Sequence, residues 1–238
     1  MTVVQKNTVL VATLPKIDEA MAASLFDGKF TVRTIEELYL SYLVDVVAQV
    51  NRYPRTRIVI HYYVPALYEM LMNLFMTPAE FRLVVPKDTG PLYSSAIERM
   101  FKSGRCKNLL LLLTLHPLVN YHIIEHTLRV LNFEDESVAI GTLSNHMPYL
   151  LGIKNLHESL LMLDDKEFYD SDSLLRRCCT INGLISPLCP LPVIQTTSDL
   201  MILKEKLERL CETRHDYPKR TLSLLRQLGS TINNTRAI

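Results

Sequence analysis

The sequence predicts an α/β fold with three layers and a mainly parallel central sheet. Short apolar or β-branched runs alternate along the chain with longer amphipathic segments, which is typical of strands alternating with helices. The run NLLLLL at residues 108–113 is nearly all leucine and suits a central strand that is covered on both faces. Strands joined by helices run parallel, so helices should cover both faces of the sheet.

The elements can be placed in order. The expected strands lie at residues 8–14, 57–63, 81–85, 108–115, 137–141, 149–153 and 191–194. The expected helices lie at residues 34–50, 65–75, 92–102, 119–131, 171–180 and 198–211. Thr34 and Glu37 have the spacing of a capping box, which would fix the start of the first helix. We expect one domain over residues 1–212 and a polar, basic tail over residues 213–238 that holds one helix at residues 221–228.

Composition excludes several classes of protein. A chain of 238 residues that is 48% hydrophobic can bury one sizeable core. Its net charge is +1, which leaves no excess of positive charge to neutralise a nucleic-acid backbone. No apolar run reaches the roughly 18 residues of a membrane span, and the N-terminus is more typical of a strand than of a signal peptide. We therefore expect a cytoplasmic protein with neither a nucleic-acid partner nor a membrane span.

The residues HIIEH at 122–126 match a zinc-peptidase pattern. His122 and His126 are one helical turn apart and could ligate one ion. A catalytic zinc also needs a third protein ligand, and no suitable acidic motif follows. We expect both histidines to lie on the solvent face of a helix, and we assign no metal. Asp170, in YDSDS, is expected to cap a helix.

In an open α/β sheet the ligand crevice lies at the carboxyl ends of the strands. Thr114 and His116 follow the leucine strand, and Asn145 and His146 follow the strand at residues 137–141. A hydroxyl, an amide and two imidazoles there could bind a small polar ligand or act as acid and base. The alternative is that they are turn residues around an unoccupied cleft.

Four stretches within about residues 8–204 resemble a family of small bacterial glycosyltransferase-A-like proteins, the nucleotide-diphospho-sugar transferase-like family. GPLYSSAIERMF at residues 90–101 keeps the family's Gly90 and Leu92, and the leucine strand leads to its Pro117. The other two stretches are SVAIGTLSNHMPYLLGI and PLPVIQTTSDL. The resemblance implies a glycosyltransferase-A-type, nucleotide-diphospho-sugar transferase fold.

The resemblance also implies a chemistry that this chain has largely lost. Such enzymes hold a nucleotide diphosphate through a divalent cation and acidic residues. This chain has Leu115, the triplet Asn145-His146-Met147 and Gln195 where the family carries carboxylates. Ser95 replaces an expected arginine, and Lys16 is the remnant of a phosphate loop. The candidate ligand-binding residues are therefore Lys16, Thr114, His116, Asn145, His146 and Gln195.

Two functions remain open. The first is a diverged, non-catalytic protein that acts by binding or assembly, has no cofactor and takes a small polar or nucleotide ligand. The second is an active nucleotide-sugar transferase or nucleotidyltransferase that uses a nucleotide sugar with Mg or Mn at an atypical, metal-poor site. The stretch HYYVPALYEMLMNLFM at residues 61–76 either packs in the core or forms an exposed surface suited to a homo-oligomer.

Overall fold

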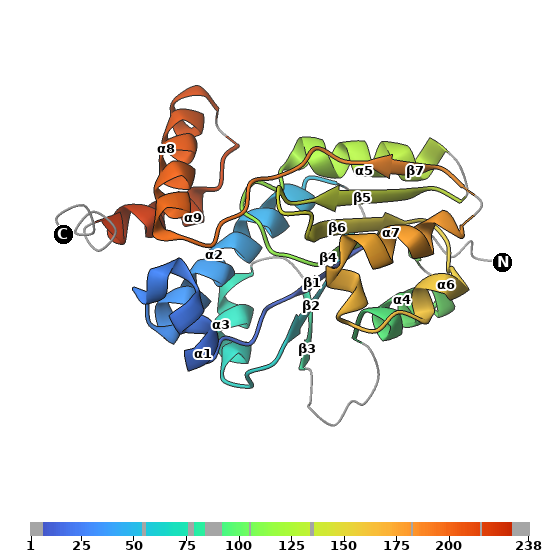
Figure 1. The fold of residues 1–238 in the computed structure, drawn as a ribbon, viewed down its shortest axis with the longest axis horizontal. Helices are drawn as coiled ribbons and strands as arrows, with labels where there is room; N and C mark the ends of the chain where they lie inside the picture. The colour runs from blue at the N-terminus through green and yellow to red at the C-terminus, as the bar shows by residue number, and fades with distance from the viewer. Residues whose placement is uncertain are drawn as a thin grey trace.

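The computed structural model describes residues 7–53, 56–75, 79–83, 92–104, 106–133, 136–181, 183–214 and 216–229. Within these residues, one seven-stranded sheet has the order β3-β2-β1-β4-β6-β5-β7 (Figure 1). The strands are β1 (Asn7–Thr13), β2 (Thr56–Tyr62), β3 (Ala79–Leu83), β4 (Cys106–Leu112), β5 (Val138–Thr142), β6 (Pro148–Ile153) and β7 (Ile185–Pro187). All of them run parallel except β6, which is antiparallel to both β4 and β5.

Helices cover both faces, which confirms the three-layer α/β fold. One face carries α2 (Val32–Val50), α3 (Leu67–Leu74), α5 (Tyr121–Phe133), α8 (Thr197–Thr213) and α9 (Lys219–Gln227), with the short α1 (Glu19–Ser24) and η1 (Phe26–Gly28) beside them. The other face carries α4 (Leu92–Lys102), α6 (Glu158–Leu161), η2 (Glu167–Tyr169) and α7 (Ser171–Cys179).

The leucine run of β4 joins the two cores. Leu110 and Leu112 pack into the core under α2, whereas Leu109, Leu111 and Leu113 pack into the core under α4. All five side chains are at most 3% exposed. Successive strand residues point to opposite faces, so a strand covered on both faces favours apolar side chains at consecutive positions. The interpretation of NLLLLL as a central strand is confirmed.

The order of the strands reverses between β1 and β4. From β1 the chain builds β2 and then β3 on one side, and it returns to place β4 on the other side of β1. The segments that leave the carboxyl ends of β1 and β4 therefore diverge, which opens a space between them. Because β6 is antiparallel, the β5–β6 turn lies at the same edge of the sheet.

Two local expectations were wrong. Helix α2 begins at Val32 rather than at Thr34, because the Thr31 side chain accepts the N–H of Thr34 and caps the helix. Glu37 forms an ion pair with Arg33 instead of a capping box. The strand expected at residues 191–194 is reduced to a single bridge between Leu191 and Leu143, and β7 forms earlier in the chain.

The helix expected in the C-terminal tail is present as α9, which packs on α2 and α8. The carboxylate of Asp45 on α2 accepts the backbone N–H groups of Arg220 and Thr221 at 3.1 and 2.8 Å. These bonds satisfy the free donors at the start of α9. Residues 230–238 lie outside the described part of the chain, as do Gly90, Val84 and Val85.

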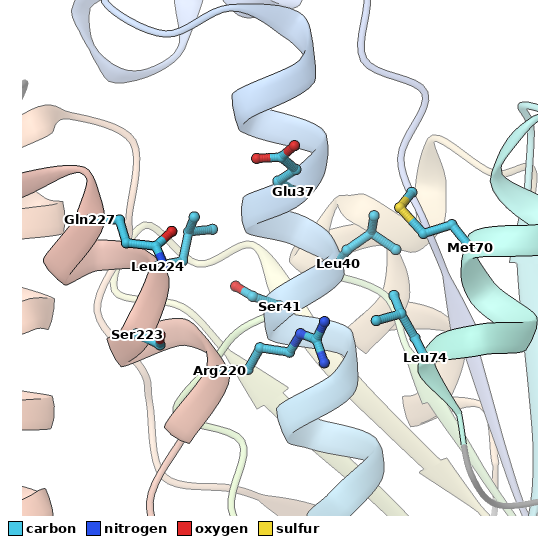
Figure 2. A pocket seen from close by; sticks show the side chains of 9 residues that line it. All are labelled: Glu37, Leu40, Ser41, Met70, Leu74, Arg220, Ser223, Leu224 and Gln227. Carbon is cyan, nitrogen blue, oxygen red and sulfur yellow. The ribbon is translucent and has the colours of Figure 1, made fainter.

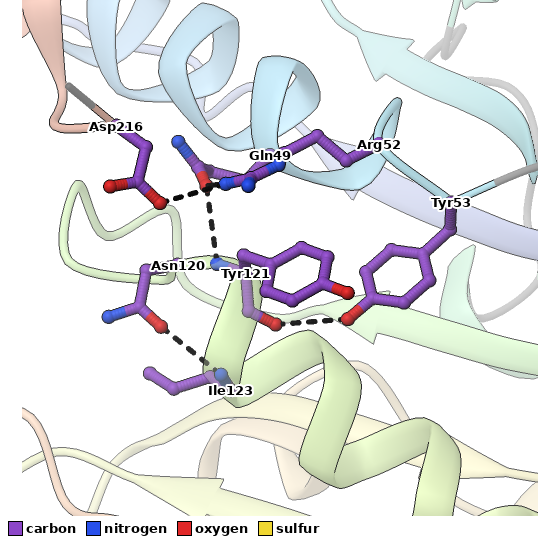
Figure 3. A network of polar contacts seen from close by, with 7 residues as sticks. All are labelled: Gln49, Arg52, Tyr53, Asn120, Tyr121, Ile123 and Asp216. Atoms are coloured by element: carbon purple, nitrogen blue, oxygen red, sulfur yellow. Dashed lines mark hydrogen bonds and ion pairs between the residues drawn. The ribbon is translucent and has the colours of Figure 1, made fainter.

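A polar network, here called the clasp, joins the end of α2, the start of α5 and the loop before α9 (Figure 3). The guanidinium of Arg52 donates a hydrogen bond of 2.8 Å to the carboxylate of Asp216 and lies over the ring of Tyr121. The rings of Tyr121 and Tyr53 are stacked, with their centroids 4.8 Å apart. The Gln49 side-chain oxygen accepts the Tyr121 N–H, and the Tyr53 hydroxyl donates to the Tyr121 carbonyl.

Candidate functional site

A crevice of about 370 Å³ opens where the strand order reverses. Its floor comes from the residues that follow β1 and β4, and its walls come from α1, α2, the end of β2, the β5–β6 turn and η2. The lining residues are Thr13, Pro15, Lys16, Met21, Tyr39, Tyr63, Leu113, Thr114, Leu115, Met147 and Tyr169. The crevice has the position at which ligands bind to open α/β sheets.

Three phenols converge on the crevice from distant parts of the chain. Tyr39 comes from α2, Tyr63 follows β2, and Tyr169 ends η2. The hydroxyl of Tyr169 is 2.6 Å from that of Tyr93, which is buried beneath it on α4. Burial raises the pKa of all four phenols, so each keeps its proton near neutral pH and can donate a hydrogen bond. The crevice thus offers aromatic faces and neutral hydroxyl donors.

Two buried polar atoms at this edge of the sheet lack a partner. Thr13 and His61 face each other across the β1–β2 pair, and they are 8% and 2% exposed. Among the described residues, neither the Thr13 hydroxyl nor His61 Nδ1 makes a well-formed hydrogen bond. The buried phenol of Tyr93 is close enough to Thr13 for the threonine hydroxyl to lower the pKa of that phenol slightly, against the larger effect of burial. Burial, with a smaller effect of the nearby Arg82, lowers the pKa of His61 to about 4, so the ring is neutral at pH 7. Unpartnered buried polar groups are costly and are often found where a ligand binds.

The described lining holds no carboxylate. Leu115 stands at the position of the resembled family's aspartate, and its side chain is 4% exposed and lines the crevice. The nearby Asp165 is engaged elsewhere, since it accepts the N–H groups of Leu92 and Tyr93 at the start of α4 at 2.9 and 3.1 Å. No group of three or more His, Cys, Asp or Glu side chains in the described parts of the chain could hold a metal ion. Because Mg²⁺ and Mn²⁺ favour several oxygen ligands, the described lining does not fit either ion.

The six candidate residues fall into two groups, and only Lys16 and Thr114 line the crevice. Lys16 is exposed and is the single cation among the described lining residues. The Thr114 hydroxyl donates to the carbonyl of Pro148 at 3.0 Å, which ties the end of β4 to the start of β6. The hydroxyl proton of Thr114 is therefore used in a structural hydrogen bond, and only the lone pairs of its oxygen are left to accept from a ligand.

His116 is buried beside the crevice and does not line it. Its Nε2 lies 2.9 Å from the carbonyl of Pro192, and its Nδ1 accepts the N–H of Leu118 at 3.2 Å. Since a carbonyl can only accept, the proton lies on Nε2 and the ring is neutral. Burial lowers the pKa of His116 to about 4, and Pro192 opposes that shift. This geometry assigns His116 to the support of the turn after β4.

Asn145, His146 and Gln195 also lie outside the lining. Asn145 Oδ1 accepts the N–H of Met147 at 3.2 Å, and His146 has a positive φ of 67°, so both build the β5–β6 turn. The turn directs Met147 into the crevice. Gln195 is exposed, and its backbone carbonyl accepts a hydrogen bond of 2.7 Å from the N–H of Phe26.

The interpretations of two helical segments are confirmed. His122 and His126 are exposed on α5, and Glu125 pairs with Arg129 at 2.8 Å. Asp170 caps α7 by accepting the N–H of Ser173 at 3.2 Å. No helix in the described ranges is long and apolar enough to cross a membrane.

The crevice tyrosines were not recognised from the sequence. Tyr39 lies inside an amphipathic helix, Tyr63 follows a strand, and Tyr169 is in a short 3-10 turn. No common spacing links them. The available signal was Tyr63, the last residue of the strand expected at residues 57–63, which places it at the carboxyl edge of the sheet.

Several solved structures share this fold. A candidate nucleotide-diphospho-sugar transferase from Desulfovibrio desulfuricans G20 matches with a TM-score of 0.71 and 18% identity over 97% of this chain and 98% of the other. A homologue of Rv0371c from Mycobacterium sp. strain JC1 matches with a TM-score of 0.54 and 13% identity over 87% and 99%. Rv0371c from Mycobacterium tuberculosis H37Rv, in complex with manganese, matches with a TM-score of 0.50 and 10% identity over 84% and 98%.

No protein-family model matches the chain, and no curated protein matches it in sequence. The structural matches nevertheless show that the chain has the nucleotide-diphospho-sugar transferase fold. At these levels of identity the likeness concerns the fold alone.

Proposed function

We propose that this protein is a diverged, non-catalytic relative of the nucleotide-diphospho-sugar transferases that binds a small polar or nucleotide ligand in the crevice without a metal ion. The observation that carries this proposal is the described lining of the crevice. It combines three neutral phenols, an unpartnered buried hydroxyl and one lysine with apolar side chains, and it has no carboxylate. Such a lining can bind by stacking and hydrogen bonding, and Lys16 supplies the one charge-assisted contact.

The absence of an acidic pair or metal ligands from the described lining also bears on catalysis. Transfer from a nucleotide diphosphate develops negative charge on the leaving group, which these folds neutralise with a cation. The imidazoles of His61 and His116 are buried and neutral, and His116 has both ring nitrogens engaged. Neither is placed to move a proton for a ligand in the crevice.

The second candidate is an active transferase with a metal-poor site, and the retained position of the crevice with Lys16 favours it. Calorimetry of the full chain with nucleoside diphosphates and nucleotide sugars, with Mn²⁺ or with a chelator, separates the two. We expect binding that the chelator does not change, together with no turnover of any nucleotide sugar. Binding that requires Mn²⁺, or release of a nucleotide diphosphate, would overturn the proposal.

A matched pair of variants locates the ligand. Lys16→Met should weaken binding of a nucleotide by about 10- to 100-fold, since a charge-assisted contact contributes about 1.5–3 kcal/mol. Lys107→Met is the control, because Lys107 is exposed near the amino end of β4, at the opposite edge of the sheet. Equal affinities of the two variants would place the ligand outside the crevice.

A further inference from the structure

A second hollow lies on the other side of α2. This groove, of about 430 Å³, has α2 as its floor and α3 and α9 as its walls (Figure 2). Tyr39 points into the crevice, and the next residue, Leu40, lines the groove. Helical spacing places these neighbouring positions on different faces of α2. The groove is thus separate from the proposed ligand site.

The groove has an apolar part and a charged rim. Leu40, Met70, Leu74 and Leu224 supply apolar side chains from all three helices, and Figure 2 shows Arg220 of α9 reaching into the space in front of α2. The guanidinium of Arg220 is exposed. Burial raises the pKa of the carboxyl of Asp45, and the charge of Arg220 opposes that shift, although no ion pair joins the two side chains. Glu37, the one acidic side chain among the described residues that line the groove, forms an ion pair with Arg33. An incoming partner with an apolar surface and a carboxylate would therefore be complementary to this groove.

Helix α3 has these properties itself. It exposes the large apolar side chains of Tyr68, Met70 and Met72 by 45%, 37% and 50%. Met70 lies with Leu74 on the flank that faces the groove, whereas Tyr68 and Met72 lie on the other flank, where Tyr68 packs against Phe81. Glu69 lies between them, is exposed and has no ion-pair partner among the described residues. The helix therefore presents apolar side chains and a carboxylate to solvent.

We propose that the α3 helix of a second copy of this chain packs into the groove and that the protein is a two-fold symmetric dimer. The groove wall and the projecting helix are the same element, so one two-fold axis lets each α3 fill the groove of the other copy. Met70 and Leu74 of the two copies then meet near the axis. Glu69 pairs with Arg220 of the partner subunit, and symmetry makes this pair twice.

The first test is the mass of the full chain in solution, measured by sedimentation velocity. We expect a dimer in the micromolar range, and a monomer at about 100 µM would overturn the proposal. Met70→Asp should give a monomer, because it places a charge in the apolar contact. Ile202→Asp is the control, since Ile202 is 64% exposed on α8 and does not line the groove. A dimer that survives Met70→Asp, or that Ile202→Asp disrupts equally, would place the interface elsewhere.

The second test exchanges the charges of the exposed residues Glu69 and Arg220. Circular dichroism and urea unfolding check the fold of each variant, because Arg220→Glu removes a positive charge that acts on the buried Asp45. Glu69→Arg and Arg220→Glu should each weaken dimerisation at least about tenfold, because each creates like charges at two symmetric contacts. The combined variant should recover the wild-type dissociation constant to within about threefold. If the two losses add instead, Glu69 and Arg220 do not meet and the proposed packing is wrong.

Discussion

The clasp and the crevice are built from similar residues and differ in how their polar groups are satisfied. In the clasp, the ring of Tyr121 lies between the ring of Tyr53 and the guanidinium of Arg52 (Figure 3). Asp216 accepts a hydrogen bond from Arg52, and Gln49 accepts one from the backbone N–H of Tyr121. In the crevice, tyrosines again gather around one cation. There, however, Lys16 has no ion-pair partner among the described residues, and the Thr13 hydroxyl has no hydrogen-bond partner.

This difference separates a structural site from a binding site. A network whose members satisfy one another contributes to stability, and a ligand could enter it only by breaking contacts. A site that keeps buried polar groups unpaired is less favourable for folding and can recover that energy when a ligand supplies the missing partners. Changes in the clasp should therefore alter stability, and changes in the crevice should alter binding.

The largest expected effect is on the stability of the whole protein in acid. His61 and His116 have pKa values of about 4 in the folded state, below the usual 6.5, so the unfolded chain binds more protons between pH 6.5 and 4. Stability is therefore complete above pH 6.5 and falls with pH through this window. We expect each histidine to lower the free energy of unfolding by about 2 kcal/mol at pH 5 relative to pH 7, as measured by urea unfolding. A profile that is flat over this range would mean that neither imidazole is held neutral.

The next effect tests the clasp. Tyr121→Ala removes the ring that lies between Arg52 and Tyr53, and it should lower the free energy of unfolding by about 2–3 kcal/mol. Tyr121→Phe is the control, because the clasp uses the ring and the backbone of Tyr121 but not its hydroxyl. Affinity for a crevice ligand should stay unchanged in both variants. A loss of affinity without a loss of stability would assign the clasp to function.

A smaller effect compares the two buried imidazoles at pH 7. His116→Leu leaves the Pro192 carbonyl and the Leu118 N–H unpaired, and it should cost about 2 kcal/mol of stability. His61→Leu removes a ring whose Nδ1 has no described partner, so it should cost less than about 1 kcal/mol. Urea unfolding measures both variants. Equal costs would show that His61 has a partner that the described residues do not include.

The smallest effect has opposite signs for stability and binding. Thr13→Val keeps the shape of the side chain and removes the unpartnered hydroxyl, so stability should stay the same or rise by up to about 1 kcal/mol. Affinity for the ligand should fall several-fold if its polar group reaches this hydroxyl. Thermal unfolding and calorimetry on one preparation give both quantities. A clear loss of stability would mean that Thr13 is satisfied in the folded protein.

The sequence was sufficient to predict the layers of the fold. The leucine run of β4 and the alternation of apolar segments reflect burial, and burial dominates the choice of element. Helix ends were harder to predict from the sequence, because the cap of α2 depends on which of two nearby threonines accepts a backbone N–H. Thr31 does so, although Thr34 has the better local pattern. The true capping box, Thr196 with Asp199 on α8, uses aspartate where the usual pattern has Glu or Gln.

The candidate site was predictable in position but only partly in composition. Thr114 was found because it lies at the end of a strand, and the carboxyl edge of the sheet is fixed by topology. Lys16 and Leu115 were found through the motifs of the resembled family, and both line the crevice. His116 follows the same strand, yet its side chain turns toward the carbonyl of Pro192, a contact 76 residues away that no local pattern reveals. The tyrosines come from separate elements and meet only after the chain has folded.

The position of the crevice on β1 and β4 has a consequence for how the protein opens. Val11 pairs with Leu111, a separation of 111 − 11 = 100 residues, and both side chains are fully buried at the centre of the sheet. Such distant pairings close a long loop and slow folding. The floor of the crevice therefore cannot open by fraying at an edge strand. Amide protons near Val11 and Leu111 should exchange with solvent only when the whole domain unfolds, so a bound ligand should slow their exchange by the factor by which it stabilises the entire fold.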